Sequence, residues 1–360
     1  MSTLHRRDLI RAGLLESDLD ALVVTCASNV RYLSGFTGSS GAVVITRHRD
    51  QDRLVTDSRY EIQAAAESPD LAALVERHVA RTAFGHAAAN GAARVGFEAD
   101  DLSVSTFEAL RGAHAALEFV ATSRVVEQLR ACKDDDEIAS LTEACRIGDV
   151  ALARLISEVR VGMTEREIAR RLDQHMLDAG ADASSFETIV ASGPNSAIPH
   201  HRPTTRPIEP GDFLKVDFGA LYAGYHSDET RTFVVGAQPL EWQSALHALV
   251  ARAQRAGIDA LRVGANVRDV DLAARSVIDD AGHSAHFGHG LGHGVGLDIH
   301  EAPMIGYSAT GILGDRTPVT IEPGVYLPGL GGVRIEDTLV VLSGGPVSLT
   351  STTRELLVLG

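Results

Sequence analysis

The sequence predicts an α/β amino-terminal domain followed by a larger α+β domain in which helices and antiparallel strands occur twice. Three observations lead to this fold class. Helical and strand-like patterns alternate over residues 1–122. An acidic run at residues 134–137 then opens a long helical pattern, where the helix dipole favours negative charge. Paired helical patterns precede paired strand-like runs in residues 137–236 and again in 240–358. We therefore divide the chain into domains at 1–122 and 123–360 and suspect a duplication in the second domain.

In the amino-terminal domain, runs of β-branched residues predict buried strands at residues 20–25, 41–46, 53–56 and 94–97, with helices near 60–67 and 104–114. No polar group there has the spacing of a metal site, so we expect a structural or dimer-forming domain. In the second domain, helices are predicted at 137–159, 164–179, 242–262 and 267–281. Thr164 with Glu167 three residues later is typical of a capping box.

Residues 213–218 and 230–235 predict a β-hairpin that carries two carboxylates, Asp217 and Asp228. If Tyr222 and Ala223 form its tip, the two aspartates face each other with Cβ atoms ~4.5 to 5.5 Å apart. Like charges so placed destabilise a sheet unless a cation lies between them, which favours a metal site. A slipped hairpin with both aspartates at a solvated edge is the alternative.

A second predicted hairpin, residues 319–326 and 332–341 around a glycine-rich turn, places Glu322 and Glu336 near the same level. Because side chains alternate along a strand, Arg334 shares a face with Glu336 and is the expected counter-charge. Asp337 points the other way and is expected to be a structural partner.

Histidines cluster in two loops. The glycine-rich stretch 286–303 carries His289, His293 and His300, and its four glycines in seven residues exclude a regular helix. A phosphate-binding loop is the alternative, but the stretch lacks a Gly-Lys-Ser/Thr ending and a following helix. The turn-rich loop 192–203 contains His200 and His201, one of which we expect to reach the site.

Four carboxylates and one imidazole carry too much negative charge for one cation. We predict two divalent cations ~3.5 to 4 Å apart that hold a hydroxide between them as the nucleophile. Ligand hardness favours Mn²⁺, with Co²⁺, Fe²⁺ and Zn²⁺ as alternatives.

Composition limits the partners. A net charge of −15 argues against nucleic acid and against an anionic membrane, so small molecules or peptides are expected. No apolar run approaches the ~18 residues of a membrane span, and the charged start is unlike a signal peptide. Three widely spaced cysteines are typical of reduced thiols. We expect a cytoplasmic protein.

The ordered set of motifs resembles the pita-bread-fold metallopeptidases, specifically their Xaa-Pro dipeptidase (prolidase) and aminopeptidase P branch. The resemblance implies a creatinase-like amino-terminal domain and a pita-bread catalytic domain. Its motifs lie at residues 29–36, 56–60, 216–220, 224–232, 292–296, 300–301, 321–324 and 333–337.

The resemblance implies a ligand set for two ions, with Asp228 and Glu336 bridging both: Asp217, Asp228, His293, Glu322 and Glu336. It also implies that His200, His289 and His300 line the substrate pocket, that Glu322 accepts a proton from the bridging water, and that Arg334 and Tyr326 support the ligands. The role of His201 stays open.

The implied function is hydrolysis of the bond before proline in a peptide, by a homodimer. Because a prolyl nitrogen has no N–H, recognition must use ring shape, and we expect His200 and His289 to pack against the ring with one free nitrogen each. The alternatives are an aminopeptidase P acting on longer peptides, a methionine aminopeptidase, a creatinase-like amidinohydrolase and a non-catalytic binding protein.

Overall fold

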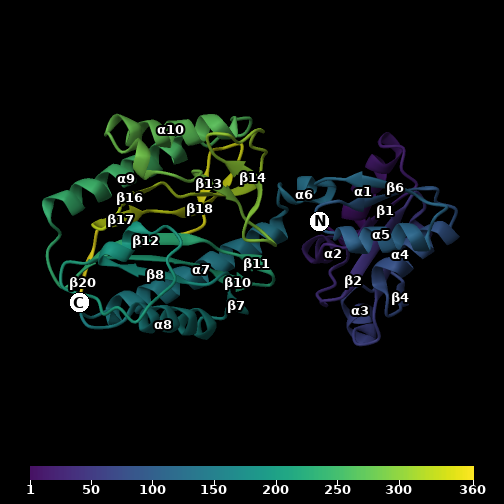
Figure 1. The fold of residues 1–360 in the computed structure, drawn as a ribbon, viewed down its shortest axis with the longest axis horizontal. Coiled ribbons are helices and arrows are strands. Elements are labelled where there is room, and N and C mark those ends of the chain that lie inside the picture. The colour runs from purple at the N-terminus through teal and green to yellow at the C-terminus, as the bar shows by residue number, and fades with distance from the viewer. The chain divides into compact units, whose positions relative to one another are not determined.

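The computed structural model describes residues 1–360, which form two compact units, Met1–Arg130 and Ala131–Gly360 (Figure 1). The first unit is built on a six-stranded mixed sheet in the order β4-β3-β2-β1-β5-β6. Its core lies between the sheet and helices α4 and α5, around Phe84, Phe97 and Leu110. The strands are β1 (Ala21–Val24), β2 (Gly41–Thr46), β3 (Arg53–Thr56), β4 (Ala73–Val75), β5 (Arg94–Glu98) and β6 (Glu118–Thr122). The helices are α1 (Thr3–Glu16), α2 (Ala27–Ser34), α3 (Glu61–Glu67), α4 (Val79–Ala89), α5 (Val104–Ala113) and α6 (Val125–Arg130).

The predicted strands and helices of this unit are confirmed. The elements that the sequence analysis missed are α2, α4, α6, β4 and β6. The alanine-rich sequence of α4 lacks the spaced large apolar residues that indicate an amphipathic helix.

The second unit repeats one pattern of two helices followed by antiparallel strands. Helices α7 (Asp135–Glu158) and α8 (Glu165–Asp178) pack against β8 (Ile189–Ser192), β9 (Phe213–Phe218) and β12 (Glu229–Val235). Helices α9 (Glu241–Ala260) and α10 (Val267–Asp280) pack against β15 (Thr317–Ile321) and β18 (Asp337–Val341), and β13 (Gly292–Gly294) pairs with β15. The two helix pairs lie on opposite sides of the strands in Figure 1. The predicted order of elements and the capping box at Thr164 are confirmed.

Short strands complete the second unit. They are β7 (Ala183–Ser184), β10 (Ala220–Tyr222), β11 (Tyr225–His226), β14 (Glu301–Ile305), β16 (Gly324–Leu327), β17 (Gly331–Arg334), β19 (Val347–Ser348) and β20 (Val358–Leu359). The sheets run β20-β12-β9-β8, β14-β13-β15-β18-β19, β11-β10-β7 and β16-β17.

The register predicted for the first hairpin is wrong by two residues. Asp217 pairs with Thr230 and not with Asp228, and the tip lies at Ala223 and Gly224. Both tip residues have positive φ, 49° and 82°, as a tight two-residue hairpin turn requires. A shift of two residues returns every side chain to its original face, so Asp217 and Asp228 still share one face of the hairpin.

The prediction that Glu322 and Glu336 lie opposite each other in the second hairpin is confirmed. Ile321 pairs with Asp337 on one side of them, and Gly324 pairs with Arg334 on the other. Strand β12 then joins the two hairpins. Thr230 forms a β-bridge with Glu336, and the Thr232 hydroxyl donates to the Arg334 carbonyl at 2.9 Å. This junction brings carboxylates from distant parts of the chain together.

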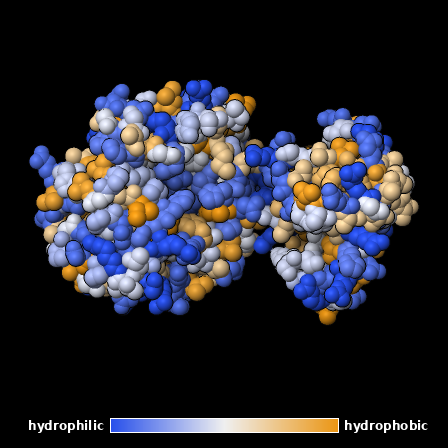
Figure 2. Space-filling model, viewed as in Figure 1, coloured by the Kyte–Doolittle hydropathy of each residue, from blue (hydrophilic) through white to orange (hydrophobic).

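The surface visible in Figure 2 is largely hydrophilic over the second unit, with small scattered groups of hydrophobic residues. None of the helices combines the length and the apolar composition that crossing a membrane requires. All three cysteines are free thiols.

Candidate metal centre

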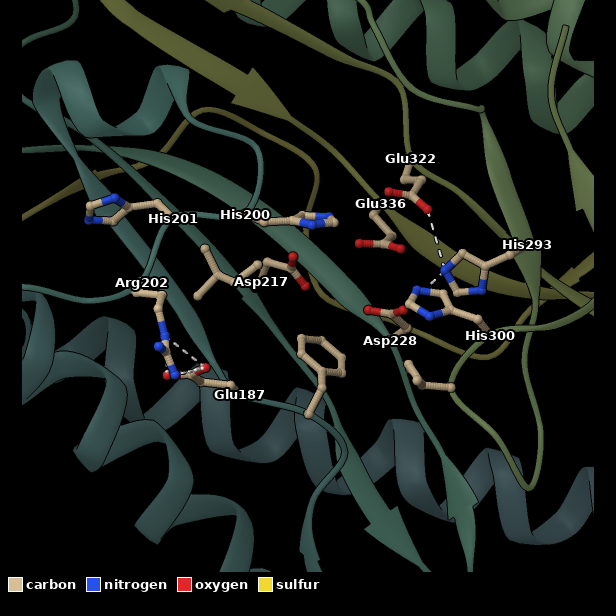
Figure 3. Close-up of a pocket in the computed structure, with 13 residues that line it drawn as sticks. Glu187, His200, His201, Arg202, Asp217, Asp228, His293, His300, Glu322 and Glu336 are labelled. Atoms are coloured by element: carbon tan, nitrogen blue, oxygen red, sulfur yellow. Dashed lines mark hydrogen bonds and ion pairs between the residues drawn. The ribbon is translucent and has the colours of Figure 1, made fainter. Parts of the chain in front are cut away.

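Five side chains from five separate segments meet at one cavity of about 280 Å³ (Figure 3). Asp217 lies on β9 and His293 on β13, while Asp228 directly precedes β12, Glu322 directly follows β15 and Glu336 directly precedes β18. These are the five residues that the sequence singled out as ligands. Three of the four carboxylates stand just outside a strand end, whereas Asp217 lies within β9, and all four border the cavity.

The cluster is compact enough for one cation to contact several side chains at once. One ligand atom each from Asp228, His293 and Glu336 lies within 4.8 Å of the other two. His293 Nε2 is 3.5 Å from Asp228 Oδ2 and 3.4 Å from Glu322 Oε1.

His293 presents the nitrogen that a metal ligand needs. Its Nδ1 donates to its neighbour Gly294 O at 3.0 Å, so the lone pair is on Nε2, which faces the carboxylates. Burial lowers the pKa of His293 to about 4, which keeps the ring neutral at pH 7. The flanking glycines permit the position, since a Cβ on Gly292 would stand 2.0 Å from Thr320 O and one on Gly294 2.4 Å from Ala302 O.

The carboxylates are poorly compensated by the protein itself. Burial and the neighbouring Asp217 and Glu322 carboxylates raise the pKa of Asp228 well above its usual value. Burial with Asp228 and Glu322 does the same to the pKa of Glu336. Burial, with a smaller contribution from Asp217 that Arg334 opposes, raises the pKa of Glu322 to about 7. Such a cluster is costly to ionise unless further positive charge is bound.

These residues fit a divalent metal centre. Asp217 Oδ1 is buried and has no hydrogen-bond partner, although its other oxygen accepts from Arg334. Glu336 has one oxygen engaged, which accepts from Thr230 Oγ1 at 2.6 Å. The donors are four carboxylates and one imidazole, the combination that oxygen-preferring divalent cations bind.

Arg334 is the cation beside the cluster, as the sequence predicts. It is 2% exposed and donates to Asp217, to Thr230 Oγ1 at 3.1 Å and to the Tyr326 hydroxyl at 2.9 Å. Tyr326 in turn donates to His289 Nε2 at 2.9 Å. A buried chain of hydrogen bonds thus runs from His289 through Tyr326 and Arg334 to Asp217. Asp337 points away, as predicted, and pairs with Arg231 at 2.7 Å.

His289 differs from its expected place. Both of its ring nitrogens are engaged, Nδ1 with Gly290 O at 2.8 Å and Nε2 with Tyr326, and it does not line the cavity. The free nitrogen expected for substrate is therefore not found. Its contacts make it a support for Tyr326 and Arg334.

The structure separates the histidine doublet that the sequence left open. Both histidines border the cavity, but the exposed His200 side chain points into it, whereas the buried His201 side chain is directed away, toward Glu165 (Figure 3). His201 Nε2 lies 2.8 Å from Glu165 Oε2. His300 is also exposed at the cavity, and its ring packs edge-on against His293 with centroids 4.4 Å apart.

Two buried charges that the sequence analysis did not single out fix the loop that carries His200. Glu165 accepts from Ser192, Asn195, His201 and Thr204. Lys215 donates to Ile198 O at 2.7 Å and to Pro199 O at 3.2 Å. Lys215 carried a signal, because it is the only polar residue besides Asp217 in an otherwise apolar strand. Glu165 carried none, since acidic residues are usual in a first helical turn.

Comparison with known families matches both units. Residues 139–343 match the model of metallopeptidase family M24, and residues 6–132 match the creatinase/prolidase N-terminal domain. The chain belongs to metallopeptidase family M24. This confirms the pita-bread fold class, the peptidase activity and the requirement of M24 enzymes for divalent metal ions.

Relatives within M24 match along nearly the whole chain. The chain is 36% identical to the Xaa-Pro dipeptidase of Pyrococcus furiosus over 342 residues, covering 95% of this chain and 96% of the relative. The structure of a Xaa-Pro dipeptidase from Bacillus anthracis has a TM-score of 0.95 and 37% identity, with 99% and 100% of the two chains covered. The X-Pro aminopeptidase from Thermotoga maritima has a TM-score of 0.91 and 32% identity, with 98% and 99% covered.

Proposed function

We propose that this M24 peptidase is a Xaa-Pro dipeptidase that cleaves the bond before proline and holds two divalent cations, preferentially Mn²⁺. The observation that supports this most is the convergence of four carboxylates and His293 on one cavity, in a chain that matches Xaa-Pro dipeptidases along 95% of its length. Asp217, Asp228, His293, Glu322 and Glu336 would hold the cations. Bound there, the ions would supply Lewis acidity that polarises the scissile carbonyl and activates water.

The protein's own groups then handle protons and charge. Glu322 faces the cavity beside His293 and accepts the proton of the attacking water. His300 is exposed on the same side and donates an N–H to the oxygen that gains charge in the transition state. Donation needs only the neutral ring, which fits the lowered pKa of His300, caused mainly by partial loss of its hydration at the cavity.

The apolar part of the cavity suits the prolyl ring. Phe186, Ile189 and Ile299 line the cavity together with His200. The three apolar side chains recognise shape and offer no hydrogen-bond donor or acceptor, which suits a ring nitrogen without an N–H. His200 stands beside them and is available to donate to a substrate carbonyl.

The test is kcat/KM for the matched peptides Ala-Pro and Ala-Ala after loading the metal-free protein with Mn²⁺. We expect Ala-Pro to be cleaved far faster. Equal values would refute a proline-directed activity. The likeness to the Thermotoga maritima enzyme supports a second candidate, a Xaa-Pro aminopeptidase, and faster cleavage of Ala-Pro-Ala than of Ala-Pro would favour it. The expected homodimer and cytoplasmic location stay predictions, and light scattering of the purified protein tests the first.

A further inference from the structure

The cavity has a second charged pair that the metal centre does not use. Glu187 and Arg202 line it, on the side away from His293 and Glu322, and their side chains lie against each other (Figure 3). Arg202 Nη2 is 2.9 Å from Glu187 Oε2, and Arg202 Nε is 3.1 Å from both carboxylate oxygens. Among the residues that line the cavity, Arg202 is the only lysine or arginine.

Arg202 is available to a ligand in a way that Arg334 is not. Arg334 is 2% exposed, is bound to Asp217, Thr230 and Tyr326, and does not line the cavity. The Arg202 side chain is 82% exposed and that of Glu187 63% exposed. An exposed ion pair of this kind contributes little to stability, so a competing carboxylate displaces Glu187 at little cost.

The backbone at Arg202 is fixed, although its side chain is exposed. His201 binds buried Glu165 at 2.8 Å, and Thr204 donates to Glu165 through its N–H at 3.0 Å and its hydroxyl at 2.7 Å. Residues on both sides of Arg202 are therefore anchored to one buried group. The guanidinium moves only within the reach of its own side chain, at the mouth of the cavity.

We propose that Arg202 binds the free α-carboxylate of the dipeptide substrate and that Glu187 is the counter-ion it leaves on binding. The inference rests on the proposed function and specifies its substrate class. A guanidinium presents two parallel N–H groups, which match a carboxylate in a two-pronged contact. In a longer peptide the prolyl carboxyl forms an uncharged amide, which does not compete with the Glu187 carboxylate for the Arg202 guanidinium. Arg202 thus favours dipeptides over longer peptides.

The experiment compares Ala-Pro with Ala-Pro-amide, which has the same size but no carboxylate. The measured quantity is the ratio of kcat/KM for the acid to kcat/KM for the amide, in metal-loaded wild type and in Arg202→Gln, Arg202→Lys and Glu187→Gln. Arg171→Gln is the matched control, because Arg171 is an exposed arginine paired with Glu158 at 3.0 Å away from the cavity.

We expect Arg202→Gln to lower the ratio about tenfold or more, mainly through KM for the acid, since the lost contact binds substrate and transition state alike. Arg202→Lys keeps the positive charge but loses the two parallel N–H groups, so its ratio falls between those of the wild type and Arg202→Gln. Glu187→Gln raises the ratio by removing the competing carboxylate, and Arg171→Gln leaves it unchanged.

Two results would overturn the inference. If Arg202→Gln leaves kcat/KM unchanged for both peptides, the guanidinium does not meet the carboxylate. An equal loss for acid and amide means that Arg202 only supports its loop. If the wild type cleaves Ala-Pro and the variant gives either result, the proposed function still stands. A wild type that cleaves neither peptide refutes both the proposed function and the role of Arg202.

Discussion

Replacing Lys215 by methionine would show how far activity depends on a residue that does not line the cavity. Lys215 is fully buried, its Nζ donates to Ile198 O and Pro199 O, and it lies 4.9 Å above the Tyr326 ring. Those two carbonyls directly precede His200. Methionine has a similar length and apolar stem, so Lys215→Met removes the donors and leaves the packing.

The expected magnitudes follow from these contacts. Pro199 O keeps a second donor, Arg334 Nη1 at 3.2 Å, whereas Ile198 O loses the one side-chain donor that the structure gives it. A hydrogen bond to a charged group contributes about 1.5 to 3 kcal/mol, and because Ile198 is exposed we place this part-buried bond near the lower end. Removal of a buried amine offsets part of this. We therefore expect the free energy of unfolding to fall by about 1 to 2 kcal/mol, and kcat/KM for Ala-Pro to fall roughly 10- to 100-fold because His200 is no longer held in place.

Urea unfolding measures the first quantity, and a double-mutant cycle with His200→Ala tests the cause of the second. If Lys215 acts through His200, Lys215→Met has little further effect on kcat/KM once His200 is alanine. If the fold-losses in kcat/KM of the two single variants multiply in the double variant, this reasoning is refuted, because Lys215 then acts by another route.

Two further predictions concern the cavity itself. His300→Ala should retain the metal, measured by elemental analysis, and lower kcat by ~10² or more, the loss typical of one well-placed stabilising donor; loss of metal would make His300 a ligand, and an unchanged kcat a structural residue. In the metal-free protein, the raised pKa of Glu322, about 7, contributes stability that is fully present below its ordinary value near 4.5 and is lost as the pH rises through 7. Glu322→Gln should therefore raise the free energy of unfolding of the metal-free protein more at pH 8 than at pH 5, as measured by urea titration. An equal change at both pH values would contradict the raised pKa.

The sequence predicted the ligand carboxylates better than it predicted their register. Alternation along the strands placed Asp217 and Asp228 on one face, and that inference tolerates a shift of two residues. The true hairpin tip puts Ala223 at a positive φ, which side-chain propensities disfavour outside glycine. The turn was therefore placed one residue too early.

What the sequence could not predict are the contacts between distant segments. His289 sits in the same glycine-rich loop as His293, but its hydrogen bond to Tyr326 depends on the packing of β16 against that loop. Likewise Glu165 reaches His201, 36 residues later. Periodicity reports which face a side chain occupies and not which distant group it meets.

The central claim is that the carboxylate cluster holds two divalent cations on which hydrolysis depends. Its most direct measurement is the number of ions per chain and the Ala-Pro hydrolysis rate as Mn²⁺ is added to metal-free protein, for the wild type and for Asp228→Ala. We expect about two ions per wild-type chain at saturation, activity that follows occupancy, and loss of both in Asp228→Ala. A metal-free wild type that is fully active would contradict the account.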